Sequence, residues 1–302
     1  MLPPNSPRPF ALRRWSALVP LAVTAMFAGC AQRAPASPPS SPQTAAAPNS
    51  AAPSPRADPI PAFDSFTVQS AALGEARRIN VHVPAGYGAA AGQRLPVLYL
   101  PDGGLDEDFP HVVHTVDSLI ASGVIRPVIV VGIPNTQRRR DLTGPTRVGS
   151  DSAIAPRVGG SLAFRQFLRQ ELIPEVDARY RTTRERAIIG ESLAGLFVVE
   201  TFLLEPTLFD HYVALDPSVW WDRGSLVDSA AARLATLDRT ARTLYLASSD
   251  VADIAAGTLR LVSALRAAPP PALLWRYEPH PELTHATIFR ALEAHALTTA
   301  LR

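Results

Sequence analysis

The sequence predicts an α/β fold with a mostly parallel central sheet and helices on both faces. From Phe63 onward, short apolar runs alternate with longer amphipathic stretches, as in chains that build a parallel sheet from strand–helix units. Several of these runs, such as LPVLYLP and PVIVVGI, are almost continuously apolar, which is typical of strands buried on both faces. With 302 residues, 47% of them hydrophobic, the chain is long enough for one large core.

The N-terminal segment has the pattern of an export signal. Arg13 and Arg14 precede the apolar run WSALVPLAVTAMFAG, which is shorter than a membrane-spanning helix requires. FAGC resembles the bacterial lipobox, in which the cysteine carries lipid. We therefore expect residues 1–29 to be a lipoprotein signal peptide and Cys30 to anchor an exported protein in the cell envelope. A plain signal peptide with an incidental cysteine and a Tat-type signal are the alternatives. Cys30 is the only cysteine, which excludes an intrachain disulfide.

Residues 30–62 are rich in proline, alanine and serine and nearly free of large apolar side chains. Such a segment buries too little surface to offset the entropy lost on ordering. The sequence therefore predicts a flexible tether from residue 30 to residue 62 and a folded domain over residues 63–302.

The net charge of +2 is a poor guide to the domain. Five of the 29 basic residues, all arginine, lie in residues 1–57, which contain no acids, so the other 24 face 27 acidic residues. A mildly acidic domain gives no electrostatic reason to expect nucleic acid as a partner.

The elements of the domain follow from periodicity and from glycine or proline at the ends of apolar runs. SFTVQSA and RRINVHVPAGY predict two early strands joined by a turn near Gly74. The remaining expected strands are LPVLYLP, PVIVVGI, AIIGES, HYVALDPS, TLYLASSD and LLWRYEPH; the expected helices cover residues 109–122, 161–180, 193–205, 253–267 and 285–301.

AIIGESLAGLF is the segment that indicates chemistry. A strand, then Glu191-Ser192-Leu193, then a helix is the context of a nucleophile elbow, in which the residues two before and two after the serine are small. Gly190 meets this requirement, and Ala194 stands where glycine is usual. The ordinary alternative is that Ser192 caps the helix. The helix N-terminus behind Ser192 would let the Leu193 N–H bind an oxyanion.

The partners of such a serine should follow it in the order acid, then histidine. His285, in a loop that leads into the last helix, fits a general base best, with His280 as the alternative and His295 as a helix-face residue. We expect the acid after the next strand but one, where Asp250 directly follows the strand. Asp253 is the alternative acid, although its position also suits the first turn of a helix.

The second oxyanion donor is expected in the loop DGGLDED after the strand LPVLYLP. Gly104 N–H is the candidate, and Gly103 would allow the turn. A simple glycine turn is the alternative.

Five motifs together resemble a known family. LPVLYLPDG, VVGIPNTQRRRDLTGP, GESLAGLF, LDPSVWWD and PELTH, in this order over residues 64–300, look like the putative esterase family of α/β-hydrolases, which includes esterase D-like enzymes and enterochelin (ferric siderophore) esterases. The resemblance implies an α/β-hydrolase fold and serine ester hydrolysis, with Ser192 as nucleophile and His285 as base. It leaves the acid open, because family members differ there and some siderophore esterases are described with a Ser–His dyad.

Two further motifs in this set bear on the substrate pocket. Arg138, Arg140 and Asp141 follow a strand end, and we expect an ion-pair network that shapes the loop; contact between an arginine and an anionic substrate is the alternative. Trp220 and Trp221 are expected to wall an acyl or catecholate site, with core packing of at least one as the alternative.

The resulting hypothesis is a serine esterase for siderophore lactones or small acyl esters, which needs no metal or cofactor. The rival hypotheses are an acyltransferase with the same triad and a surface-tethered binding protein on a hydrolase scaffold. The expected partners are a small-molecule ester and, through lipidated Cys30, a membrane. Neither the oligomeric state nor the physiological substrate follows from the sequence.

Overall fold

The computed structural model describes residues 58–88 and 92–302. The predicted signal peptide, Cys30 and most of the predicted tether lie outside these residues. The last part of the predicted tether, residues 58–62, contacts the domain. The carbonyl oxygens of Pro59 and Ala62 are hydrogen-bonded to His114 and His82, respectively, each at 2.8 Å. Residues 58–62 of the predicted tether therefore lie against the domain, because backbone groups there have partners on it.

In the described part of the chain, eight strands form one sheet in the order β1-β2-β4-β3-β5-β6-β7-β8. β2 is antiparallel to both β1 and β4, and all other pairs are parallel. The predicted α/β fold with a mostly parallel sheet is thus confirmed. The strands are β1 (Asp64–Ser70), β2 (Glu75–His82), β3 (Leu95–Pro101), β4 (Ile129–Ile133), β5 (Thr182–Glu191), β6 (His211–Leu215), β7 (Arg242–Ser248) and β8 (Leu273–Pro279).

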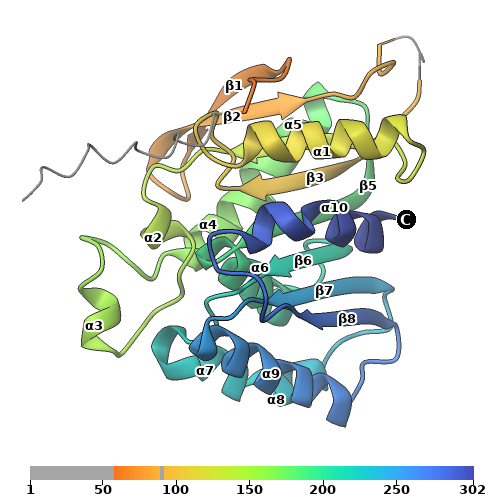
Figure 1. Cartoon of the computed structure of the whole chain (residues 1–302). Coiled ribbons are helices and arrows are strands. Elements are labelled where there is room, and N and C mark those ends of the chain that lie inside the picture. The colour runs from red at the N-terminus through yellow and green to blue at the C-terminus, as the bar shows by residue number, and fades with distance from the viewer. Residues whose placement is uncertain (1–57, 89–91) are drawn as a thin grey trace, which may run out of the picture. The chain divides into compact units, whose positions relative to one another are not determined.

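Helices cover both faces of this sheet (Figure 1). The helical segments are α1 (Phe109–Ala121), α2 (Arg138–Asp141), α3 (Gly149–Ser152), α4 (Ser161–Phe167), η1 (Leu168–Leu172), α5 (Ile173–Arg179), α6 (Leu193–Leu204), η2 (Trp221–Gly224), α7 (Ser225–Asp228), α8 (Ala230–Leu234), α9 (Ala252–Ala267) and α10 (Ile288–Leu301). The long helix expected over residues 161–180 is α4, η1 and α5 run together. η1 is a wide π turn just before Pro174, whose ring nitrogen has no hydrogen to donate to the preceding turn.

Successive strand residues point to opposite faces, so the sheet separates two cores. In β3, Val97 and Tyr99 pack into one core with α4, α5, α6, α8 and α9. Leu98 and Leu100 pack into the other core with α1 and α10. The near-continuous apolar character of these strands follows from burial on both sides. Within the described residues, no helix is both long and apolar enough to cross a bilayer.

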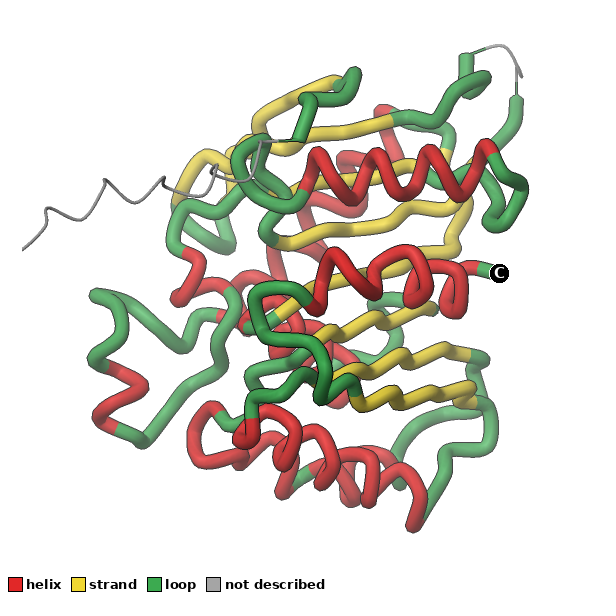
Figure 2. Tube along the Cα trace, viewed as in Figure 1, coloured by secondary structure: helices red, strands yellow, loops and turns green. Residues whose placement is uncertain are grey.

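Loops collect at the carboxyl ends of the parallel strands, where ligand sites of such sheets lie (Figure 2). The loop after β3 passes very close to β4 there. A Cβ built on Gly103 would lie 2.3 Å from the backbone nitrogen of Ile133, so only glycine fits. Asp102, not Gly103, has the positive φ of this turn, at 60°. The expected role of Gly103 in turning the chain is therefore corrected to one of close approach.

Candidate active site

Ser192 lies on a strained turn between β5 and α6. Its backbone has φ 60° and ψ −120°, outside the regions that a non-glycine residue normally occupies. The neighbours must be small, because a Cβ on Gly190 would lie 2.7 Å from the Cβ of Ala194. The Ser192 side chain makes no capping hydrogen bond to α6. The helix-cap alternative is therefore wrong, and the hydroxyl is available for another contact.

That contact is with His285, which lies 93 residues later in the loop between β8 and α10. The Ser192 Oγ and the His285 Nε2 are 3.0 Å apart. The other ring nitrogen, Nδ1, is 2.5 Å from the Oδ2 of Asp216, which directly follows β6. Three loops thus bring a hydroxyl, an imidazole and a carboxylate into one hydrogen-bonded chain, with the geometry of a nucleophile, its base and an orienting acid.

Asp216 is fully buried and is held by Ser249, the residue after β7, as well as by His285. Ser249 donates its backbone N–H to Oδ1 and its hydroxyl to Oδ2, each at 2.7 Å. Burial alone would raise the pKa of Asp216, but the hydrogen bonds from His285 and Ser249 outweigh it and lower this pKa below its usual value. The carboxylate therefore stays ionised and fixes the orientation of the imidazole.

The pKa of His285 is shifted the other way. Its hydrogen bond to Asp216 raises this pKa, and burial opposes the rise. The ring is still partly open to solvent, with 39% of the side chain exposed. A raised pKa suits a base that must hold a proton taken from Ser192.

Asp250 is not the acid that contacts His285, and that expectation is corrected. Asp250 is exposed, and its backbone N–H donates to the Leu283 carbonyl oxygen at 3.0 Å. Asp253 is also exposed, in the first turn of α9. The order of strands explains why Asp216 and not Asp250 contacts His285. β6 lies directly beside β5, whereas β7 lies one strand further away, and neighbouring strands are about 4.8 Å apart. The acid at the end of β6 is therefore the one within reach.

Neither of the other late histidines reaches Ser192. His280 Nδ1 is 2.7 Å from the Oε1 of Glu282, and His295 Nε2 is 3.0 Å from the Oε2 of Glu278. Only His285 of the three contacts Ser192, so the preference for His285 agrees with the geometry.

One of the two expected oxyanion donors is occupied. Leu193 is the first residue of α6, where backbone N–H groups have no partner within the helix. Gly104 N–H, in contrast, donates to the Oε2 of Glu107 at 2.7 Å, and Glu107 N–H donates back to the Gly104 carbonyl oxygen at 3.1 Å. The expectation that Gly104 presents a free donor is therefore wrong for this arrangement of the loop.

Arg138 lies beside the site as part of an ion-pair network. Its Nε and Nη2 contact the two carboxylate oxygens of Asp102 at 2.7 and 2.6 Å. Its positive charge also acts on Glu191 and His285. Arg140 pairs separately with Glu75 and Asp141. The expected ion-pair network is present, although Arg138 belongs to a different part of it from Arg140.

The two tryptophans have different surroundings. Trp221 is 4% exposed, and its Nε1–H donates to the Gly144 carbonyl oxygen at 2.8 Å, so it packs in the core, as the alternative for one of the two tryptophans had it. Trp220 is 37% exposed. It follows Ser218, whose hydroxyl oxygen is 3.5 Å from the Ser192 Oγ. Trp220 is thus the tryptophan that can face a ligand at this rim.

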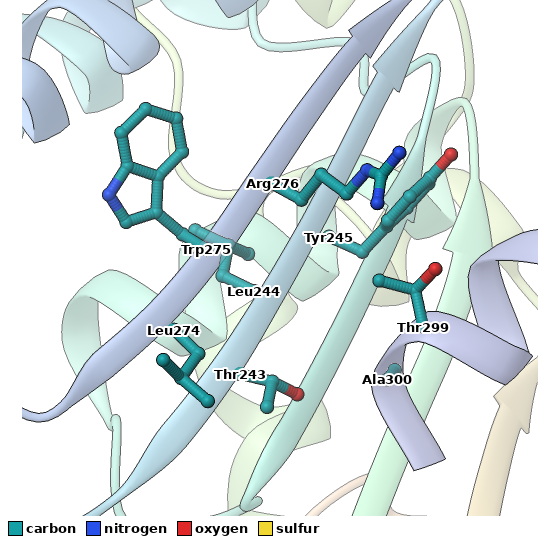
Figure 3. Close-up of a pocket in the computed structure, with 8 residues that line it drawn as sticks. All are labelled: Thr243, Leu244, Tyr245, Leu274, Trp275, Arg276, Thr299 and Ala300. Carbon is teal, nitrogen blue, oxygen red and sulfur yellow. The ribbon is translucent and has the colours of Figure 1, made fainter. Parts of the chain in front are cut away.

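Two cavities in the described part of the chain differ in their distance from Ser192. One of about 260 Å³ includes Leu196, Glu200 and Trp221, beginning one turn of α6 beyond Ser192. Another, of about 160 Å³, is lined by residues of β7, β8 and the end of α10 and contains none of the groups described above (Figure 3). Ser192 itself is partly exposed.

Carboxylates around His285 also have to be considered as ligands of a cation. Ligand atoms of Glu191, Asp216 and His285 lie within 4.8 Å of one another. The 2.5 Å hydrogen bond between His285 and Asp216 accounts for this proximity. We assign no metal to the group.

Comparison with known proteins agrees with this geometry. The model of the family described as "Putative esterase" matches residues 70–263, which is more than half of the chain. The chain belongs to this family. The resemblance seen in the five motifs is therefore confirmed.

Siderophore esterases are among the relatives. Ferri-bacillibactin esterase BesA of Bacillus subtilis is 35% identical over 115 residues, which cover 34% of this chain and 39% of the relative. The siderophore triacetylfusarinine C esterase of Aspergillus fumigatus is 29% identical over 193 residues, or 59% of this chain and 63% of the relative. The matches thus span less than two thirds of these curated relatives.

The fold has solved counterparts. An IroE-like serine hydrolase from Shewanella oneidensis superposes with a TM-score of 0.73 and 26% identity, covering 79% of each chain. The siderophore hydrolase EstB from Aspergillus nidulans superposes with a TM-score of 0.67 and 20% identity, covering 81% of this chain and 96% of the other, which bears on the fold alone. The domain therefore has the α/β-hydrolase fold that the resemblance implied.

Proposed function

We propose that this protein is a carboxylic ester hydrolase in which Ser192 is the nucleophile, His285 the general base and Asp216 the orienting acid. The observation that carries the proposal is the hydrogen-bonded chain from Ser192 Oγ through both ring nitrogens of His285 to Asp216, built on a strained elbow. Membership of the esterase family supports the same reaction class.

The reaction follows from the positions of these atoms. His285 Nε2 takes the proton of the Ser192 hydroxyl as Oγ attacks the ester carbonyl carbon. The C–O bond to the alcohol breaks, and His285 returns the proton to the leaving alkoxide oxygen. Water then attacks the acyl-enzyme by the same route, releasing the acid and restoring Ser192. Asp216 keeps the Nδ1–H oriented and stabilises the imidazolium in both halves.

The oxyanion of each tetrahedral intermediate would be bound first by the Leu193 N–H, at the positive end of α6. Gly104 N–H becomes a second donor only when the Glu107 carboxylate moves away from it. Binding of a substrate carbonyl oxygen would have to displace that carboxylate.

Hydrolysis is favoured over acyl transfer by the openness of the base. With 39% of the His285 side chain exposed, the imidazole that must activate the water is open to solvent. An acyltransferase would need to hold an acceptor alcohol there and exclude water. The ratio of hydrolysis to acyl transfer is measured by adding alcohol acceptors during turnover and quantifying the ester formed by transfer.

For the substrate we propose an ester or lactone of a siderophore. The support comes from named relatives, including the ferri-bacillibactin and triacetylfusarinine C esterases. Exposed Trp220 gives the rim an aromatic face, which suits an aromatic ligand.

For the location we propose export and lipid anchoring at Cys30. The support is the sequence of the N-terminal segment. Radiolabelled palmitate supplied to expressing cells should be incorporated into the full chain and not into Cys30→Ala. Equal labelling of the two proteins would contradict the proposal.

Turnover of p-nitrophenyl butyrate tests the chemistry. Ser192→Ala should lower kcat by about 10³-fold or more, because it removes the nucleophile. Glu282→Gln, which changes a loop residue outside the site, is the control and should stay within twofold. Undiminished hydrolysis by folded Ser192→Ala would refute the proposed mechanism. EDTA should leave the rate unchanged, since His285 supplies the base.

A further inference from the structure

A second carboxylate lies behind His285. The Oε1 of Glu191 is 3.4 Å from His285 Nδ1, the same atom that contacts Asp216 at 2.5 Å. Glu191 is the residue immediately before Ser192, so the strained elbow fixes its backbone. The imidazole therefore has an acid on each of two neighbouring strand ends, β5 and β6.

The two acids differ in how firmly they are held. Asp216 is fully buried and accepts two hydrogen bonds from Ser249 in addition to the one from His285. Glu191 keeps 18% of its side chain exposed, and among residues 58–88 and 92–302 no group donates a hydrogen bond to its carboxylate. Glu191 is thus free to shorten its contact with Nδ1, whereas Asp216 is fixed.

The charges around Glu191 set its ionisation near neutrality. Burial raises its pKa to about 7; His285 and Arg138 oppose the rise, while Asp108 and Asp216 add to it. These four groups come from the loop before α10, from α2, from the residue before α1 and from the end of β6. The negative charge beside His285 is therefore present above neutral pH and lost below it.

We infer that Glu191 is a positioning residue of the proposed hydrolase, a second acid that holds the His285 imidazolium and can replace Asp216 as the acceptor of Nδ1–H. The inference rests on the proposed function. A negative charge at this distance favours the protonated ring, so ionised Glu191 raises the pKa of His285. Glu191 touches neither the reacting carbonyl nor the leaving group and acts only through the imidazole.

The first experiment is the pH profile of kcat/KM with p-nitrophenyl butyrate. Its acidic limb reports the ionisation of the base in the free enzyme. In Glu191→Gln this limb should move to lower pH by about one unit, because a charge that favours the imidazolium is gone. Glu282→Gln removes a carboxylate from His280, a histidine outside the site, and is the matched control whose limb should not move.

The second experiment is a double-mutant cycle. In an enzyme with one orienting acid, the Asp-to-Asn change lowers kcat by about 10⁴-fold. Here Asp216→Asn should lose only about 10- to 1,000-fold, because Glu191 takes over. Adding Glu191→Gln to Asp216→Asn should cost at least about tenfold more than Glu191→Gln costs in the wild-type chain. Independent effects of the two changes would overturn the inference.

A measurement without turnover separates this inference from the proposed function. In the Ser192→Ala background, NMR titration of labelled histidine gives the pKa of His285 directly. Glu191→Gln should lower it by about one unit. If Ser192→Ala is inactive as proposed and this pKa does not move, the inference alone fails. If folded Ser192→Ala hydrolyses the ester normally, the proposed function fails, whatever the titration gives.

Discussion

At the scale of single residues, the site depends on backbone strain at Ser192. A serine at φ 60° costs about 1–3 kcal/mol, which the flanking strand and helix must offset. In return, the hydroxyl projects from the elbow toward His285 and not onto the end of α6. Gly190 and Ala194 are the neighbours that make this turn sterically feasible, since a Cβ added to Gly190 would lie only 2.7 Å from the Cβ of Ala194.

The two aspartates that follow β6 and β7 give a matched pair of variants. Asp216→Asn should lower kcat/KM by about 10- to 1,000-fold, because the orienting carboxylate is lost. Asp250→Asn should change it less than twofold, since Asp250 is exposed and does not contact His285. Steady-state kinetics at pH 8 on both variants measures this; a larger loss for Asp250→Asn would contradict the geometry.

Residue types and local context were sufficient to predict Ser192 and His285. A serine flanked by small residues at a strand end has few structural alternatives, and only three histidines follow it beyond His211. Asp216 was missed because the choice among acids depends on which strand lies next to β5, and strand order is a property of the tertiary structure. The occupation of Gly104 N–H by Glu107 likewise depends on a side-chain conformation that no motif encodes.

At the scale of elements, α1 and α10 are joined by a buried histidine. His111 Nδ1 is 2.6 Å from the Oε2 of Glu293, and its Nε2 is 3.0 Å from the Oδ1 of Asp108. Burial alone would lower the pKa of His111, but the hydrogen bonds to Asp108 and Glu293 raise it to about 9. The ring is therefore protonated at neutral pH and ties the two helices on one face of the sheet.

The contacts of protonated His111 with Asp108 and Glu293 should make the free energy of unfolding fall at alkaline pH. The pKa of histidine in the unfolded chain is about 6.5, so the contribution of His111 is complete below that pH and is lost as pH rises through 9. His111→Asn should lower the free energy of unfolding by about 3 kcal/mol at pH 6 and by less at pH 10.

Urea denaturation at both pH values measures this difference. His114→Asn, an exposed histidine on the same helix, is the control and should cost less than about 0.5 kcal/mol at either pH. A loss in His111→Asn that is equal at pH 6 and pH 10 would contradict the assignment of a protonated His111.

Long, strongly patterned elements were predictable, and short ones were not. α1, α6, α9 and every strand lie where apolar runs indicate them. α2, α3, α7 and α8 have only four or five residues, too few for helical periodicity to be detected. They depend on tertiary contacts such as the pairing of Arg140 with Glu75 in β2. The loops that shape the rim of the site are therefore the least predictable part of the fold.

At the scale of the whole molecule, the groups proposed for catalysis all belong to one sheet with two cores. β5, β6 and β8 precede Ser192, Asp216 and His285, and their parallel direction brings the three loops to one edge. The geometry of the site requires no residue before Asp58. The described domain should therefore contain the complete activity.

Truncation tests this independence. A chain of residues 58–302 should fold with a Tm within a few degrees of that of the chain from residue 30, and its kcat/KM for p-nitrophenyl butyrate should agree within twofold. The truncated chain keeps the contact of Asp58 with Arg290 and those of Pro59 and Ala62 with the domain. Loss of folding or of activity would contradict an autonomous domain.

The central claim is that His285 activates Ser192 for attack. A fluorophosphonate probe forms a covalent bond only with an activated serine, and peptide mass spectrometry locates it. We predict one modified site, Ser192, in the wild-type chain, and labelling at least about 100-fold slower in His285→Ala. Labelling at another residue, or labelling of Ser192 at the same rate without His285, would contradict the account.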